Sequence, residues 1–95
     1  MSHSEKFAQL LNEKFADAGQ FAANRFGVDA GRKFDRVWAE TQDGNNRHVH
    51  AFVDRLTGEV YKSAGWKAPA KGVRFTSVEV AADNADLHGS YLYKR

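Results

Sequence analysis

The residue types in this sequence that are best suited to bind a ligand lie in a basic and aromatic segment, residues 60–78. Its sequence, VYKSAGWKAPAKGVRFTSV, interleaves cations with aromatic rings and contains no acidic residue. Lysine and arginine neutralise phosphates, and an exposed aromatic ring can stack on a nucleic-acid base. The segment therefore predicts a weak, salt-sensitive nucleic-acid site. Its expected binding residues are Lys62, Trp66, Lys67, Lys71 and Arg74.

The same segment also has a purely structural interpretation. Tryptophan is a large apolar residue that often anchors a loop to a core, and lysines on a loop are usually solvated. Under this interpretation Trp66 and Phe75 are buried, and the cations point into water. The exposure of Trp66 distinguishes the two interpretations, because only an exposed indole can stack on a base.

The position of the positive charge is more informative than its total. The chain of 95 residues has a formal net charge of +2. Residues 1–30 contain three bases and four acids, residues 31–59 five of each, and residues 79–95 two and three, whereas residues 60–78 contain four bases and no acid. The excess is therefore a local patch and not a basic tail.

A protein-interaction surface is the alternative to nucleic-acid binding. If residues 48–54 and 60–64 pair as a hairpin, Phe52 and Tyr61 lie side by side across it. An aromatic pair that stays exposed on an uncovered sheet face favours association with a second copy of the chain or with a host protein.

Two histidines raise the question of a metal site. Alternation along residues 48–54 places His48, His50, Phe52 and Asp54 on one face of a strand and Val49, Ala51 and Val53 on the other. The two imidazoles could form half of a zinc site that Asp54 or His88 would complete, but exposed cross-strand histidines explain the pair equally simply. Because the spacing fixes no third ligand, we predict no metal and no cofactor.

Catalytic motifs are absent from the sequence. It has no cysteine, no G-x-S-x-G motif, no Walker loop and no H-E-x-x-H motif. Asp83 and Asp86 would lie one turn apart on a helix surface, where solvation explains them. We therefore predict a protein that is not an enzyme. The lack of cysteine also excludes disulfides and is consistent with a reducing cytoplasm.

Hydrophobic spacing indicates the elements that must position these residues. Apolar residues recur at three- and four-residue steps over 4–26, which predicts a helix with Ser4 as its cap and a stop near Gly27. The DAGRK stretch that follows is typical of a connection. Period-two alternation then predicts strands, and Gly58 suits the reversal between the last two because it tolerates positive φ. The expected strands are 34–41, 48–54 and 60–64.

The segment 75–87 allows two interpretations. RFTSVEV alternates like a strand, but Ser77 could instead cap a short helix that ends near Leu87, and we prefer the helix. The final YLYKR is expected to be extended.

These elements predict a single α+β domain, residues 1–95. A long N-terminal amphipathic helix packs on a three-stranded antiparallel meander, and a short C-terminal helix and a terminal extended segment follow. The sheet face that the helix leaves uncovered is the expected place for a binding surface. Neither a secretory signal nor a membrane span is visible, so we expect a cytoplasmic protein.

A long stretch of the sequence resembles a family of small uncharacterised proteins of tailed bacteriophages, including marine phages. The shared pattern is F-V-D-x-x-T-G-x-V-Y-K over 52–62, followed by WKAPAKGVR over 66–74. The match is close over 47–75 and loose over 89–95, where the sequence reads GSYLYKR. This resemblance implies a phage accessory protein acting in the cytoplasm of a bacterial host, without indicating an activity.

In outline, the expected order of a helix, three strands and a helix also resembles the double-stranded-RNA-binding domain. That fold places a lysine cluster at the start of its second helix. The corresponding stretch here is the acidic TSVEVAAD, and the basic residues fall in the loop before it. The resemblance therefore concerns the fold alone.

Overall fold

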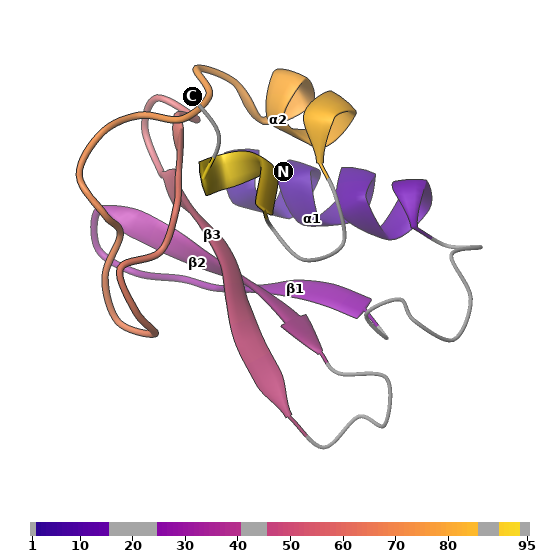
Figure 1. The fold of residues 1–95 in the computed structure, drawn as a ribbon, viewed down its shortest axis with the longest axis horizontal. Coiled ribbons are helices and arrows are strands. Elements are labelled where there is room, and N and C mark those ends of the chain that lie inside the picture. The colour runs from indigo at the N-terminus through magenta and orange to yellow at the C-terminus, as the bar shows by residue number, and fades with distance from the viewer. Residues whose placement is uncertain (1, 16–24, 41–45, 86–89, 94–95) are drawn as a thin grey trace.

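A four-stranded sheet and two helices make up the described part of the chain, residues 2–15, 25–40, 46–85 and 90–93 of a computed structural model (Figure 1). The fold is α+β, as predicted, but the sheet has four strands where three were expected. The elements are α1 (His3–Lys14), β1 (Arg25–Asp29), β2 (Phe34–Glu40), β3 (Arg47–Asp54), β4 (Val60–Tyr61), α2 (Val78–Asn84) and the 3₁₀ helix η2 (Ser90–Tyr93).

The additional strand is β1, which lies at one edge of the antiparallel sheet in the order β1-β2-β3-β4. The predicted helix over 4–26 is wrong for Arg25 and Phe26, which belong to β1. Asn12 of α1 helps to hold Phe26 in this edge strand. Its side chain donates to Phe26 O at 3.0 Å and accepts from Phe26 N at 2.8 Å. These two bonds satisfy backbone groups that an edge strand otherwise leaves unpaired.

Helices α1, α2 and η2 all lie over the same face of the sheet (Figure 1). The core between these helices and the sheet includes Phe7, Leu11, Val37, Val53 and Leu92, each of which is completely buried. This layer explains the amphipathic spacing of the first helix.

The first helix begins two residues earlier than the sequence suggested. Ser2 is its N-cap, and Ser2 and Glu5 form a capping box. The expected cap, Ser4, is instead buried and donates a hydrogen bond to Asp35 Oδ2 at 2.5 Å. Residues 16–24 of the predicted helix lie outside the described residues.

The predicted hairpin between β3 and β4 is confirmed. Gly58 has a φ of 77°, the left-handed conformation expected for this turn. The Asp54 carboxylate accepts from the backbone N–H groups of Leu56 at 2.8 Å and Thr57 at 3.1 Å, and these bonds lower the pKa of Asp54. The returning strand is shorter than predicted, since β4 ends at Tyr61.

The C-terminal part of the chain confirms one interpretation and corrects another. Ser77 caps α2 by accepting from Val80 N, so the helical interpretation of this segment is right. The expected end at Leu87 lies outside the described residues. The segment predicted to be extended begins instead as the 3₁₀ helix η2, because Tyr91 and Leu92 turn into the core.

A β-bulge in β3 changes which side chains share a face. Val37 pairs with Ala51 and Trp38 pairs with Val49, so His50 is an extra residue between them. Its ring contacts Phe7 at 6.2 Å between centroids, on the helix-covered side. The prediction that His50 and Phe52 share one face is therefore wrong.

In the part of the chain that the structure describes, neither helix is long and apolar enough to cross a membrane.

Candidate functional site

The basic and aromatic segment forms a second, smaller hairpin beside the sheet. Residues 62–70, which we call the Trp66 hairpin, double back because Ala64 N donates to Ala68 O at 2.9 Å and Ala70 N donates to Lys62 O at 2.8 Å. Figure 1 shows this excursion as the loop at the left of the view. The geometry places Trp66 and Lys67 at the tip.

The Trp66 side chain is exposed and stacked on an arginine of the sheet. The residue is 43% exposed, and the Arg36 Cζ lies over its ring at 4.2 Å from the centroid. Arg36 alternates along β2 with the core residue Val37, so the tip lies on the sheet face opposite the helices. The structural interpretation, in which Trp66 is a buried anchor, is therefore wrong for Trp66, whereas Phe75 does pack against the core.

A cleft of about 230 Å³ separates this tip from the turn between β1 and β2. Its lining contains four cationic side chains and one carboxylate, with the rings of Phe34 and Phe52 between them. We call it the cationic cleft. Its charged residues are Asp29, Arg32, Lys33, Arg36 and Lys67.

The positive charge of this cleft is largely unneutralised. Arg32, Lys33 and Lys67 have no carboxylate within 4.0 Å among the described residues. The carboxylate of Asp29 is shared, because its Oδ2 lies 3.8 Å from Arg36 Nε and its Oδ1 accepts from the Trp38 indole at 3.3 Å. The cleft therefore attracts anions.

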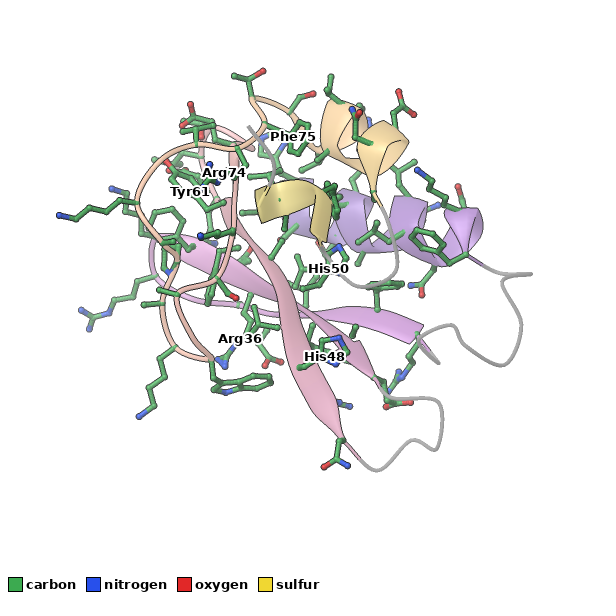
Figure 2. All side chains as sticks on the ribbon, in the orientation of Figure 1. Arg36, His48, His50, Tyr61, Arg74 and Phe75 are labelled. Carbon is green, nitrogen blue, oxygen red and sulfur yellow. The ribbon has the colours of Figure 1, made fainter. Side chains whose placement is uncertain are left out.

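The predicted binding residues divide into two groups. Lys67 lines the cationic cleft and Trp66 is stacked on Arg36 at its edge, whereas Lys71 is exposed on the following loop, beside Gly72. Figure 2 places Arg74 near Tyr61, well away from Arg36. Lys62 and Arg74 are both half-buried. The five residues therefore do not form one cluster.

Three cationic side chains of the cleft were missed in the sequence. Arg32, Lys33 and Arg36 belong to a stretch with equal numbers of acids and bases, so a charge count along the chain conceals them. Period-two alternation could have revealed Arg36, because Asp35 points to the opposite face, where Ser4 binds it.

The alternative surface at Phe52 and Tyr61 is paired as predicted but is not exposed as that hypothesis requires. The two residues are partners in the β3–β4 register. Phe52 is only 4% exposed, and Tyr61 is half-buried with its ring centroid 5.0 Å from that of Phe34. Burial raises the pKa of Tyr61, and the charges of Glu59 and Asp54 raise it further.

The two histidines lie in different surroundings. His48 is exposed, whereas His50 is buried and its Nε2 lies 2.7 Å from the Tyr91 hydroxyl oxygen. Within the described ranges, no three side chains of the metal-binding types gather at one place. His88, considered above as a third ligand, lies outside those ranges.

Comparison with known proteins places the chain in a family. The model of a family of unknown function (DUF7717) matches residues 2–94. The chain belongs to this family. No curated protein and no solved structure matches it. The family match thus extends over nearly the whole sequence and assigns no activity, so a function must be argued from the site itself.

Proposed function

We propose that the protein binds nucleic acid weakly and without catalysis, through the Trp66 hairpin and the adjoining cationic cleft. The observation that supports this proposal is the exposed indole of Trp66, stacked on Arg36 at the edge of a cleft with excess positive charge. Cations contact phosphates and the ring contacts a base, which is the combination that sequence-tolerant binding requires.

The number of available cations sets the expected strength. Each neutralised phosphate contributes a slope of about −0.7 in log affinity against log salt on a single strand and about −0.9 on duplex. Three or four contacts from Arg32, Lys33, Arg36 and Lys67 therefore give a slope of roughly −2 to −4. Such binding is detectable at low salt and weak at physiological salt.

Fluorescence anisotropy of a labelled oligonucleotide tests the proposal. The dissociation constant should rise steeply between about 50 and 200 mM salt, and the Lys67→Glu/Lys71→Glu variant should lose binding. The single variant Lys67→Glu should also weaken binding. Its control is Lys6→Glu, which reverses a charge on α1, on the other side of the sheet, and should bind like the wild type. Binding that does not change with salt, or equal losses in these two single variants, would contradict the proposal.

The biological setting that we propose is that of a phage accessory protein in the bacterial cytoplasm. It is based on the resemblance of residues 47–75 to small proteins of tailed bacteriophages.

The interaction-module hypothesis has less support, because the burial of Phe52 removes its ring from the accessible surface. Light scattering after size-exclusion chromatography tests its homodimer form, and a strict monomer at high concentration would eliminate that form.

A further inference from the structure

We infer that the ligand is single-stranded nucleic acid, with one unpaired base stacked on the open face of Trp66 and its neighbouring phosphate held in the cationic cleft. The inference deepens the proposed function and depends on it. It follows from the geometry of the ring, the composition of the cleft and the positions of the nearby carboxylates.

The ring of Trp66 can receive one base and no more. The Arg36 guanidinium covers one of its faces, with Cζ 4.2 Å from the centroid, while 43% of the residue stays exposed. Insertion between two stacked base pairs requires both faces of a side chain, so this ring cannot act as an intercalating wedge in a duplex. An unpaired base needs only one face.

Arg36 joins the stacking platform to the phosphate site. Its side chain lines the cationic cleft as well as contacting Trp66. The cleft has two walls, one formed by the β1–β2 turn with Arg32 and Lys33 and the other by the hairpin tip with Lys67. Its volume of about 230 Å³ lies below the roughly 300–1,000 Å³ of ordinary small-molecule sites. One backbone phosphate with part of its sugar is therefore a more suitable occupant than a whole cofactor.

The cationic surface continues beyond this cleft. Arg32 and Lys33 also line a second depression, of about 470 Å³. Asp54, Arg55 and Leu56 of the β3–β4 turn line it as well. Arg55 is less available, because its Nε lies 3.4 Å from Asp35 Oδ1 and its Nη1 donates to Gly31 O at 2.7 Å. Arg32 and Lys33 therefore border both the cleft and the path of the next phosphate.

The carboxylates near these two depressions already accept hydrogen bonds within the protein. Asp54 accepts from two backbone N–H groups of its turn, and Asp35 accepts from Ser4 Oγ and from Gly31 N. Asp29 lines the cleft and Asp54 lines the second depression, so an anionic backbone passes near two carboxylates. The four cations of the cleft outnumber these two carboxylates.

A competition experiment tests the inference. A labelled single-stranded oligonucleotide is displaced by three unlabelled competitors: the same strand, a relaxed closed-circular plasmid as duplex without ends, and inorganic polyphosphate. The single strand should compete best per phosphate. Trp66→Leu should weaken single-strand binding roughly five- to 150-fold, the range for losing one stacked base, and leave polyphosphate binding unchanged.

Two further variants test the contribution of Arg32 and Lys33. Arg32→Gln/Lys33→Gln should weaken binding of all three competitors, and Lys71→Gln, which removes one exposed charge outside the cleft, should have a smaller effect. Thermal unfolding of each variant verifies that it is folded. The emission that Trp66→Leu removes from the wild-type spectrum reports the Trp66 ring, and single strands should quench it.

The outcomes separate the inference from the proposed function. Equal competition by plasmid and single strand, or no effect of Trp66→Leu on single strands, would overturn the inference and leave nucleic-acid binding standing. Equal competition by polyphosphate would also overturn it, since the site would then recognise charge alone. Absence of binding to any nucleic acid at low salt would overturn both.

Discussion

The two tryptophans of this protein are both stacked on arginines of the sheet, but their surroundings differ. Trp38 is 6% exposed, with the Cζ atoms of Arg47 and Arg25 at 3.8 and 5.3 Å from its ring centroid. Glu40 pairs with both arginines, with its Oε2 at 3.8 Å from Arg47 Nε and 3.4 Å from Arg25 Nε. Trp66 has one arginine and is 43% exposed.

The difference teaches that an arginine–indole stack can serve two purposes. Around Trp38, Glu40 pairs with both arginines and Asp29 accepts from the indole N–H, so the ring and its cations are held by contacts within the sheet. Arg36 covers one face of the Trp66 ring, and 43% of the residue stays exposed. The nearby cations Arg32, Lys33 and Lys67 have no carboxylate within 4.0 Å among the described residues. The first arrangement stabilises the sheet, and the second suits a ligand.

The largest expected effect is the difference in stability between variants that remove Trp38 and Trp66. Trp38→Ala should lower the free energy of unfolding by about 3–5 kcal/mol, because it empties a buried ring site. Trp66→Ala should lower it by less than about 1 kcal/mol, the value of a partly exposed cation–π contact. Urea denaturation measures both. Similar losses in the two variants would contradict the comparison.

A smaller effect should come from the glycine beneath Trp38. Gly27 pairs with Trp38 across β1 and β2, and a Cβ there would lie 2.2 Å from Trp38 Cζ2. Gly27→Ala should therefore cost about 1–3 kcal/mol, as overpacking does. Gly65→Ala, beside Trp66, is the matched control, because a Cβ there meets nothing within 4 Å and the change should stay within about 0.5 kcal/mol. A neutral Gly27→Ala would show that the indole does not rest on this glycine.

The smallest effect concerns Asp54, whose carboxylate lies in the β3–β4 turn and also lines the depression shared with Arg32 and Lys33. Backbone hydrogen bonds from Leu56 and Thr57 lower the pKa of Asp54 in the folded protein. The ionised carboxylate therefore favours folding above the ordinary aspartate pKa of about 3.9, and this contribution is lost as the pH falls below that value. The stability difference between wild type and Asp54→Asn should shrink as the pH falls through this range, as denaturation at several pH values would show. A difference independent of pH would mean that the turn does not hold the charged form.

Sequence reasoning predicted the parts of the fold that depend on local chemistry. Alternation identified β2 and β3, Gly58 identified the hairpin turn, and Ser77 identified the start of α2. It missed β1, because the pairing of that strand with Trp38 and its bonds to Asn12 are tertiary contacts. The bulge at His50 was also invisible, since strict alternation cannot indicate an inserted residue.

The candidate site was predicted only where it is local in sequence. Trp66 and Lys67 stood out in a segment without acids, but the opposite wall of the cleft was hidden in a stretch with equal numbers of acids and bases. Lys71 and Arg74 were grouped with them by proximity in the chain, although the fold separates Arg74 from Arg36 (Figure 2). Successive side chains of a strand point to opposite faces of the sheet. A count of charges along the sequence therefore does not show which charges lie on the same surface.

Because Arg36 lies in β2 and not on the hairpin, recognition and folding are linked. An oligonucleotide that contacts both β2 and the Trp66 hairpin would bind the native chain and not the denatured one. Its presence should therefore raise the melting temperature in proportion to the logarithm of its concentration once the site is saturated. A peptide copied from residues 60–78 would lack the guanidinium behind the indole and should bind far less tightly than the intact protein.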